Sequence, residues 1–511
     1  MKVLTAAQMR QVDRLTIERG IPGLILMENA AHRVVEFLAR AFDPLSDHRI
    51  AVLCGKGNNG GDGLAIARQL LTRFAPRSLD VALAASREDF AGDAAENLRM
   101  FEACGGRLQS SITAAMREAT LVIDALLGTG IKGAAAAPVL EWIEQINTRF
   151  PHAKVIAVDL PSGMAGDQAD NEGICARADA TITFTAPKIC HALPPNCDRV
   201  GELHVAAIGS PASLYEDDGS IFLSLIEPRW FRPLFEKRPP GAHKGDFGHV
   251  LTIGGSVGKT GAAAMAGLSA LRAGAGLVTV ASAASALPAI AAHAAELMTE
   301  PLPETESGSI AAAAYALLGS LTARKNVLAA GPGMGIHPET VAFARKLYDQ
   351  SLLPVVVDAD GLNALTGPHQ KAAGPRILTP HPGEMARLCG ITAEVVQANR
   401  CEIARRYATG SGATVVLKGQ RTLLAFPDGR VWINPTGTPA MATGGSGDIL
   451  TGLIAGLLAQ FPGHADLAAG AAVWLHGRAG ELGAAVLGEK CLIATDLLRF
   501  LPEAMRELEN I

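Results

Sequence analysis

Two glycine-rich segments of this 511-residue chain carry polar side chains of the kinds that bind phosphate groups or transfer protons. The first reads Gly-Lys-Gly-Asn-Asn-Gly-Gly-Asp-Gly over residues 55–63, and the second reads Thr-Gly-Gly-Ser-Gly-Asp over residues 443–448. Each runs directly into a helical pattern. The first turn of a helix binds anions through its free N–H groups and the positive end of its dipole. Both segments therefore predict a ligand site at the start of a helix.

The first segment has the Gly-x-Gly-x-x-Gly spacing of dinucleotide-binding loops. An ordinary NAD(P) dehydrogenase also needs an acidic residue at the end of the second strand. Here that strand ends in Ala-Ala-Ser at residues 84–86, so a dehydrogenase is not favoured. A turn used only for helix–strand packing would explain the glycines. It would not explain Asn58, Asn59 and Asp62 beside them.

Two further strand ends carry polar loops, Asp-Ala-Leu-Leu-Gly-Thr-Gly from Asp124 and Asp-Leu-Pro-Ser-Gly from Asp159. In a doubly wound sheet, the carboxyl ends of the strands meet at one crevice, where ligands bind. Asn59, Asp124 and Ser162 would then supply oxygen ligands for a monovalent or other hard cation. Each aspartate taken alone also fits a loop cap.

The second glycine-rich segment lets successive backbone N–H groups point at one spot ahead of the apolar helix expected at 449–460. Such a site holds a phosphoryl group during transfer, and Asp448 can accept a proton from the attacking hydroxyl. A simple turn with Asp448 as a helix-favouring charge is the alternative. Residues 254–260 read Gly-Gly-Ser-Val-Gly-Lys-Thr, which is one residue short of a P-loop, so we expect a ligand-lining loop there.

Apolar runs that end in glycine-rich turns alternate with helical patterns, which predicts mostly parallel sheets covered by helices on both faces. The alternation fails between about residues 211 and 245 and then resumes, which indicates two α/β domains. We expect a Rossmann-like doubly wound sheet over 1–220, a linker at 221–240 and a second α/β domain over 241–505. The expected strands are 49–55, 80–85, 121–128, 154–163, 180–186, 202–209, 248–255, 277–282, 326–333, 354–361, 377–383 and 413–419, with a hairpin at 421–434 and the first segment's helix at 64–74.

Composition excludes several classes of function. A net charge of -5 and 5% aromatic residues do not suit a polyanion binder, so no nucleic-acid partner is expected. The amino-terminal segment is charged, and no apolar stretch reaches the ~20 residues of a membrane span. Neither a signal peptide nor a membrane partner is expected. Eight cysteines without a Cys-x-x-Cys pair indicate reduced thiols and a cytoplasmic location.

Four motifs of the first half, taken together, resemble the NAD(P)H-hydrate epimerase (YjeF N-terminal) domain. They are NNGGDG at 58–63, DALLGTG at 124–130, DLPSG at 159–163 and TAPK at 185–188. The resemblance covers roughly residues 1–220. It implies a site for hydrated NADH and NADPH, the substrates of that domain.

This resemblance also implies particular residues. Potassium would be held by Asn59, Asp124 and Ser162, and Asp159 would shuttle protons. The implied hydrate contacts are Asn58, Asn59, Gly60, Gly61, Asp62, Gly128, Thr129, Gly130, Ile131, Lys132, Gly133, Ala134 and Asp159.

Residues 241–505 resemble the ADP-dependent NAD(P)H-hydrate dehydratase family, which has a ribokinase-like α/β fold. The motifs include KGDFG at 244–248, GPGMG at 331–335, TPHPGE at 379–384 and GGSGD at 444–448. The resemblance implies ADP as co-substrate, Mg²⁺ with the nucleotide, and Asp448 as the base. The implied hydrate contacts are Ala262, Gly333, Gly335, His381 and Asp448, and the implied nucleotide contacts are Lys418, Gly419, Gln420, Arg421, Thr422 and Gly447.

Together the two resemblances indicate a bifunctional enzyme that epimerises hydrated nicotinamide cofactors and dehydrates their S form. We expect it to be a homo-oligomer. The alternative is a ribokinase-like kinase for a small molecule, with a nucleotide-binding regulatory domain at its amino-terminal end. A kinase would release a stable phosphomonoester, whereas the repair enzyme would release AMP, phosphate and NAD(P)H.

Overall fold

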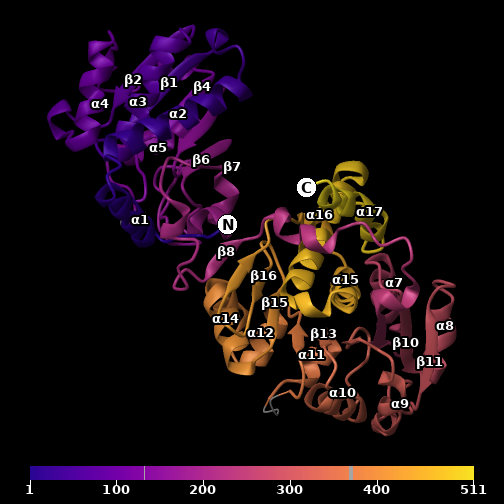
Figure 1. Cartoon of the computed structure of the whole chain (residues 1–511). Coiled ribbons are helices and arrows are strands. Elements are labelled where there is room, and N and C mark those ends of the chain that lie inside the picture. Colours follow the sequence, from indigo (N-terminus) through magenta and orange to yellow (C-terminus); the bar gives the residue numbers. More distant parts are fainter. Residues whose placement is uncertain (132, 368–371) are drawn as a thin grey trace. The chain divides into compact units, whose positions relative to one another are not determined.

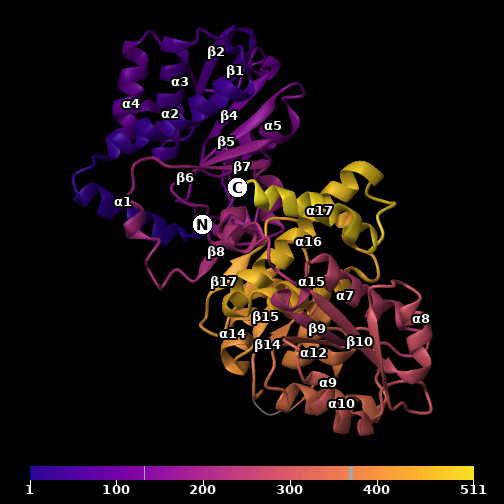
Figure 2. The same ribbon diagram turned by 45° about the vertical axis from the view of Figure 1, so that its right-hand side comes forward.

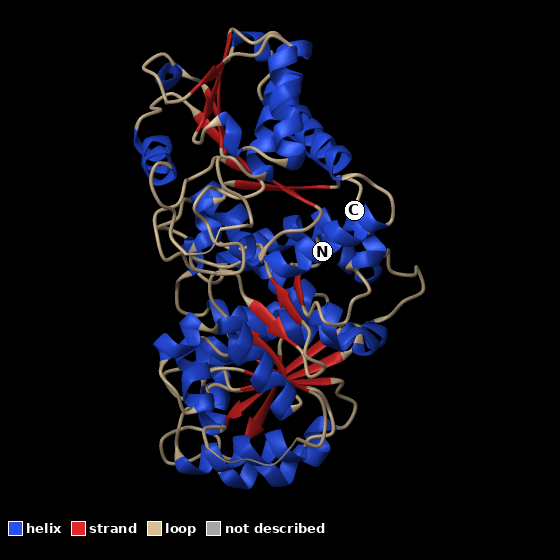
Figure 3. Cartoon of the chain, turned by 90° about the vertical axis from the view of Figure 1, so that its left-hand side faces the viewer, coloured by secondary structure: helices blue, strands red, loops and turns tan. Residues whose placement is uncertain are grey.

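The computed structural model describes residues 1–131, 133–367 and 372–511. The chain divides into two compact units, Met1–Leu223 and Ser224–Ile511 (Figure 1). Each unit is built around one sheet with helices on its faces (Figure 3). The α/β class expected for both halves is therefore confirmed.

The sheet of the first unit has seven parallel strands in the order β3-β2-β1-β4-β5-β6-β7. The strand order reverses between β1 and β4, and doubly wound sheets bind ligands outside the strand ends at such a point. The strands are β1 (Arg49–Cys54), β2 (Ser78–Leu83), β3 (Leu108–Gln109), β4 (Leu121–Ala125), β5 (Lys154–Val158), β6 (Ala180–Phe184) and β7 (Glu202–Ala206). The helices are α1 (Ala6–Glu18), α2 (Gly23–Ala41), α3 (Asn58–Arg73), α4 (Gly92–Ala103), α5 (Val139–Thr148) and α6 (Ile189–Ala192).

Residues of β1 alternate between two apolar cores. Ile50 and Val52 pack into the core shared with α2, α3 and α4, whereas Ala51 and Leu53 pack into the core shared with α5. Because both faces of the strand are covered, it has a continuous apolar sequence instead of an alternating one.

The sheet of the second unit has the order β11-β10-β9-β12-β13-β14-β15-β16-β17-β8. It is parallel from β11 to β15, and β15, β16 and β17 pair antiparallel. The strands are β8 (Leu223–Leu225), β9 (His249–Ile253), β10 (Leu277–Ala283), β11 (Met298–Leu302), β12 (Val327–Ala330), β13 (Val355–Val357), β14 (Arg376–Leu378), β15 (Thr414–Leu417), β16 (Leu423–Ala425) and β17 (Val431–Ile433). Its strand order reverses between β9 and β12.

Figures 1 and 2 show α7, α15 and α16 as neighbouring helices, and their apolar residues share one core with β9. A second core contains residues of α10 and α11. The helices are α7 (Thr260–Arg272), α8 (Leu287–Ala291), α9 (Leu318–Thr322), α10 (Pro338–Gln350), α11 (Asp360–Ala364), α12 (Pro382–Cys389), α13 (Ala393–Ala398), α14 (Arg400–Ser411), α15 (Ser446–Gln460), α16 (Ala465–Leu487) and α17 (Asp496–Glu509). Among the helices in the described ranges, none is long and apolar enough to cross a membrane.

The strands expected from the sequence are all present, and three others were not expected. These three, β3, β8 and β11, are edge strands, where one side of the strand has no ladder partner and the sequence pattern is weak. The segment expected to be a linker, 221–240, contains β8 and the 3₁₀ helix Pro228–Leu234, and Phe231 and Leu234 of that helix are buried in the core. The prolines interrupt the hydrophobic periodicity of this segment, but they do not prevent its apolar side chains from packing into the core.

Candidate active sites

The loop between β1 and α3 lies against the loop that follows β4. A Cβ atom on Gly55 would lie 1.9 Å from the Leu126 carbonyl oxygen, so a side chain would prevent this approach. The Asn59 side-chain amide donates a hydrogen bond to the Leu127 carbonyl at 3.0 Å. These contacts fix the first turn of α3 beside the carboxyl end of β4. The helix begins at Asn58, six residues before the expected start. Its first turns were missed because they consist largely of glycine, which is a poor helix former.

Asp124 and Ser162 form the buried centre of the first site. Asp124 accepts hydrogen bonds from the Ser162 backbone N–H at 2.8 Å and from the Ser162 hydroxyl at 2.5 Å. Ser162 Oγ accepts a hydrogen bond from the Leu127 N–H at 2.9 Å, so Asn59, Asp124 and Ser162 meet around Leu127. Burial raises the pKa of Asp124 to about 6, although the hydrogen bonds from Ser162 lower it.

Asn59 Oδ1 is buried in this group and accepts no hydrogen bond from the described part of the chain. A buried amide oxygen without a donor is costly unless water or a cation satisfies it. Together with the Asp124 carboxylate and the Ser162 hydroxyl, it makes a set of hard oxygen donors. The residues present therefore fit the cation that the sequence predicts here.

Asp159, directly after β5, is paired with a lysine to which sequence analysis gave no role. Lys188 Nζ lies 2.6 Å from Asp159 Oδ1 and donates to Thr183 Oγ1 at 2.8 Å. Burial by itself raises the pKa of Asp159, but the Lys188 ammonium outweighs burial and lowers that pKa below its usual range. Lys188 is 1% exposed, and lysine is among the residues least expected in a core. The TAPK motif contained this residue without indicating its partner.

Two more carboxyl groups influence the same site. Asp62 lies in the second turn of α3, and burial raises its pKa well above the ordinary value, with further raising by the charges of Asp159 and Asp13. Burial also raises the pKa of Asp13, on α1, to about 6. Asp62 was predicted from the first glycine-rich segment, whereas Asp13 was not predicted, because nothing in an amphipathic first helix distinguishes one charged residue from the others.

The other predicted contacts of the first site lie in the first turn of α3 and on the loop between β4 and α5. Asn58 is exposed, whereas Gly60 and Gly61 are buried. Gly128 packs on Asn59, because a Cβ on Gly128 would lie 3.3 Å from the Asn59 Cβ. Farther along, the half-buried residues are Thr129 and Ile131, and the exposed residues are Gly130, Gly133 and Ala134. The predicted contact Lys132 lies outside the described residues.

In the second unit, the first turn of α15 packs directly on a buried ion pair. Lys418 Nζ lies 2.6 Å from Asp358 Oδ1, and the Thr451 hydroxyl donates to Asp358 Oδ2 at 2.9 Å. A Cβ on Gly447 would lie 3.1 Å from Lys418 Nζ and 3.3 Å from Asp358 Oδ2. The glycine at this position therefore lets the helix start approach the pair closely. Asp358 was not among the residues predicted for this site.

Asp448 follows Gly447 in the first turn of α15 and is half-buried. Its pKa is raised to about 7, first by burial and then by the Asp358 carboxylate, while Lys418 lowers it. Asp360 and Glu384 raise it further. A carboxylate whose pKa lies near neutrality suits a general base at physiological pH.

His381 caps the amino end of α12. Its Nδ1 accepts hydrogen bonds from the N–H groups of Gly383 at 3.0 Å and Glu384 at 3.4 Å, so Nε2 carries the proton. Burial lowers the pKa of His381, and the Lys418 and Arg387 charges lower it further. His381 is therefore a neutral donor at the same end of the sheet as Lys418, whose Nζ lies 3.8 Å from Glu384 Oε2.

Three of the predicted hydrate contacts of the second site, Ala262, Gly333 and Gly335, lie at the β9–β12 switch point. A Cβ on Gly333 would lie 3.1 Å from the Ala262 Cβ, so these two residues are neighbours. The Gly335 N–H donates to Asp360 Oδ2 at 2.9 Å, and Lys259 Nζ lies 3.2 Å from the same oxygen. Asp360, which sequence analysis did not assign, thus links the loop before α7 to the loop after β12.

The predicted nucleotide loop follows β15. Its backbone conformation is restrained by the Thr422 hydroxyl, which donates to the Gly419 carbonyl at 3.0 Å, and Arg421 donates to the Pro435 carbonyl at 3.2 Å. Arg400, at the start of α14, donates to the carbonyl of Gln420 at 2.5 Å and to that of Lys418 at 3.4 Å. Arg400 was not predicted, because its backbone partners are unreadable from a sequence.

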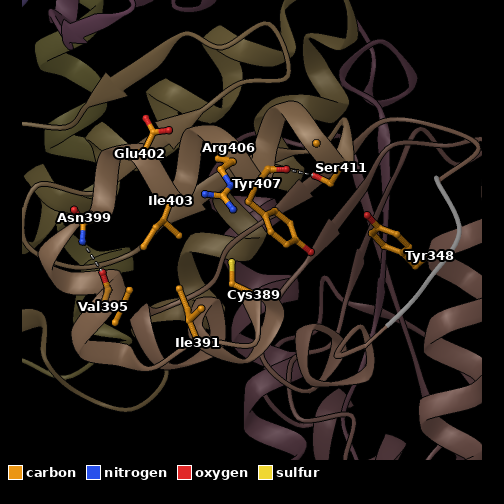
Figure 4. A pocket seen from close by; sticks show the side chains of 11 residues that line it. Tyr348, Cys389, Ile391, Val395, Asn399, Glu402, Ile403, Arg406, Tyr407 and Ser411 are labelled. Carbon is orange, nitrogen blue, oxygen red and sulfur yellow. Dashed lines mark hydrogen bonds between the residues drawn. The ribbon is translucent and has the colours of Figure 1, made fainter.

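A cavity of about 800 Å³ in the second unit contains none of the predicted site residues. Figure 4 shows its lining, which includes Cys389, Ile391, Val395, Tyr407 and Tyr348. Most of these residues belong to α13 and α14 or to the connection that precedes them. The cavity is therefore separate from the group of residues at the start of α15.

The fold and both sites define a protein with a Rossmann-like amino-terminal unit and a ribokinase-like carboxyl-terminal unit. Residues 23–190 match the family described as YjeF-related protein N-terminus, and residues 250–503 match the family described as NAD(P)H-hydrate dehydratase. A ribokinase-like superfamily protein from Enterococcus faecalis, 27% identical, matches with a TM-score of 0.50 over 56% of this chain and 96% of that one.

Relatives match the chain over its full length. The bifunctional NAD(P)H-hydrate repair enzyme of Moorella thermoacetica is 45% identical over 100% of this chain and 98% of the relative. The enzyme of the same name from Thermofilum pendens is 36% identical over 100% of this chain and 97% of the relative. The chain belongs to the family of bifunctional NAD(P)H-hydrate repair enzymes, and the small-molecule kinase is not favoured.

Proposed function

We propose that this chain repairs hydrated NADH and NADPH at two separate sites. The first unit interconverts the R and S hydrates, and the second dehydrates the S hydrate while ADP is converted to AMP and phosphate. The observation that carries this proposal is that each unit gathers its chemistry-bearing side chains just after the carboxyl ends of neighbouring parallel strands of its own sheet, on the edge where doubly wound sheets bind ligands.

Epimerisation requires one proton acceptor and one proton donor. Loss of the proton from the C6 hydroxyl lets a carbonyl form as the bond from C6 to the ring nitrogen breaks, and the nitrogen then takes a proton. Closing the ring on the other face reverses both transfers and restores each group. Asp159, which Lys188 keeps ionised, is the acceptor.

Potassium is the cation that we assign to the first site. Asn59, Asp124 and Ser162 would hold it, and the buried Asn59 Oδ1 would become one of its ligands. The bound ion would supply positive charge beside the Asp124 carboxylate. It would also fix the Leu127 loop, because Asn59 and Ser162 both hydrogen-bond to Leu127.

Dehydration requires conversion of hydroxyl into a better leaving group. Asp448 accepts the proton of the C6 hydroxyl, whose oxygen bonds to the β-phosphorus of ADP as AMP leaves. Loss of phosphate from C6 and of a proton from C5 then restores the ring. The N–H groups of the first turn of α15 stabilise the developing charge. Mg²⁺ would neutralise phosphate charge when bound, and the loop 418–422 would bind the rest of the nucleotide.

The test is incubation of mixed R and S hydrates with ADP, followed by the absorbance of reduced nicotinamide and by AMP release. We expect all of the hydrate to be consumed, with one AMP per NAD(P)H. A stable phosphomonoester without return of NAD(P)H would instead indicate the kinase alternative. The homo-oligomer and the cytoplasmic location stay predictions from the sequence.

A further inference from the structure

The two oxygens of the Asp159 carboxylate have different surroundings, because Lys188 contacts only one of them. Lys188 Nζ donates to Asp159 Oδ1, to Thr183 Oγ1 and, at 3.2 Å, to the Phe184 carbonyl. The Thr183 hydroxyl also donates to Asp159 Oδ1, at 2.9 Å. Within the described ranges, no hydrogen bond reaches Asp159 Oδ2, and the side chain is 14% exposed. One oxygen is therefore fixed, and the other is free to meet a ligand.

The backbone holds Asp159 in the same orientation. Its φ of 64° lies in the left-handed region, which non-glycine residues adopt at a cost of about 1 kcal/mol or more. The Asp159 N–H donates to the Ile182 carbonyl at 2.9 Å, so the turn is tied to β6. The backbone turn and the hydrogen bonds to Oδ1 together fix the orientation of the Asp159 side chain.

The charged groups around Asp159 are not balanced. Lys188 is the ammonium that lowers its pKa, and His191 beside it is neutral, because burial lowers the pKa of His191 to about 3. The carboxyl groups of Asp13 and Asp62 also lie within electrostatic range. Asp62 is 9% exposed, and within the described residues its carboxyl group makes no hydrogen bond, so its burial beside a single ammonium favours the protonated form.

We propose that Lys188 is a positioning residue that holds Asp159 as a carboxylate with Oδ2 available to the C6 hydroxyl, and that Asp62 is the acid that protonates the ring nitrogen. Asp159 takes the hydroxyl proton, the C6–N bond breaks, and its electron pair takes the proton of Asp62. Ring closure on the other face returns both protons. This proposal rests on the proposed epimerase activity of the first unit.

The first experiment replaces Lys188 and follows the pH dependence of kcat/KM for conversion of pure R hydrate to the R and S mixture. In Lys188→Met, the acid limb should move to higher pH by at least one unit, so kcat/KM at pH values below the limb of the unchanged protein should fall about tenfold. Lys188→Arg should keep the limb of the unchanged protein. Lys154→Met is the matched control, because it removes an exposed Lys–Asp pair of the same unit and should change nothing.

Thr183→Val offers a second test if Lys188→Met does not fold. It removes the second side-chain donor to Asp159 Oδ1 in a nearly isosteric side chain, and it should move the acid limb in the same direction by a smaller amount. Folded Lys188→Met or Thr183→Val with an unmoved limb would overturn the positioning role.

Asp62→Asn tests the acid. It keeps the size of the side chain but removes the transferable proton, so kcat for epimerisation should fall by roughly 10²-fold or more with KM within about threefold. An unchanged kcat would remove Asp62 from the reaction. If the unchanged protein itself does not interconvert the hydrates, the proposed function fails; if it does and these variants behave like it, the present assignment fails.

Discussion

Lys418 Nζ and Asp358 Oδ1 lie 2.6 Å apart beneath the first turn of α15, and Gly447 leaves the space that this contact needs. Burial alone raises the pKa of Asp358, but the Lys418 ammonium outweighs it and lowers that pKa below its usual range. Burial alone lowers the pKa of Lys418, but the neighbouring carboxylates outweigh burial and raise that pKa above its usual value. The pair is therefore ionised, and the first turn of α15, where we propose that the phosphoryl group binds, packs against it.

Removal of one partner of this pair should destabilise the second unit. Lys418→Met leaves Asp358 as an unpaired buried charge, which costs roughly 3 kcal/mol or more of the free energy of unfolding. The double variant Asp358→Asn, Lys418→Met should recover part of that loss. Urea unfolding followed by tryptophan fluorescence is a suitable measurement, because Trp230, Trp432 and Trp474 belong to this unit. A double variant less stable than Lys418→Met would contradict the prediction.

The two activities should separate in Asp448→Asn. This change removes the proposed base of the second site and leaves the first unit intact, so ADP-dependent return of NAD(P)H should fall by about 10²–10⁴-fold while R and S hydrates still interconvert. Chromatography of the hydrates and absorbance of NAD(P)H measure the two reactions in one sample. Loss of both activities in the folded variant would contradict the two-site proposal.

The dehydration rate should depend on pH through Asp448. A general base acts when it is deprotonated, and the pKa of Asp448 is raised to about 7 by burial and neighbouring carboxylates. The kcat/KM for dehydration should therefore rise with pH up to about 7 and then level off. Asp360→Asn removes one of the charges that raise this pKa and should move the limb to lower pH. A flat profile between pH 5 and pH 8 would exclude Asp448 as the base.

Epimerisation should depend on Asp124 and on potassium. Asp124→Ala removes the charged member of the set that includes Asn59 and Ser162, and it also removes both acceptors of the Ser162 hydrogen bonds. The epimerase rate should fall strongly, and replacement of potassium by tetramethylammonium should reproduce part of the defect. Dehydration of pure S hydrate is the internal control. An epimerase rate indifferent to both changes would leave Asp124 without a catalytic connection.

ADP should support dehydration better than ATP. The loop before α7 lacks P-loop spacing, and its Lys259 is paired with Asp360 at 3.2 Å, so no cradle for a γ-phosphate is formed there. Steady-state dehydration of S hydrate with each nucleotide freed of the other gives the comparison. A higher kcat/KM with ATP, accompanied by ADP accumulation, would reverse the assignment.

Much of the fold could be predicted from the sequence because many of the buried strands are apolar runs that end in a turn containing glycine, and this pattern is local. The edge strands β3, β8 and β11 could not, since a strand with one partner has little pattern to detect. Residues 221–240 were expected to form a linker because prolines mark breaks in periodicity. Phe231 of this segment is nevertheless buried, because it packs into the core formed by residues distant in the sequence.

The sequence by itself determined which residues could act: the glycines that let loops approach, and polar side chains such as Asp124, Asp159 and Asp448 at strand ends or helix starts. The tertiary structure decided their charge states. Lys188 and Asp159 are 29 residues apart, and Lys418 and Asp358 are 60 apart. Electrostatic energy depends on distance in space and on burial, and neither quantity is encoded in residue spacing.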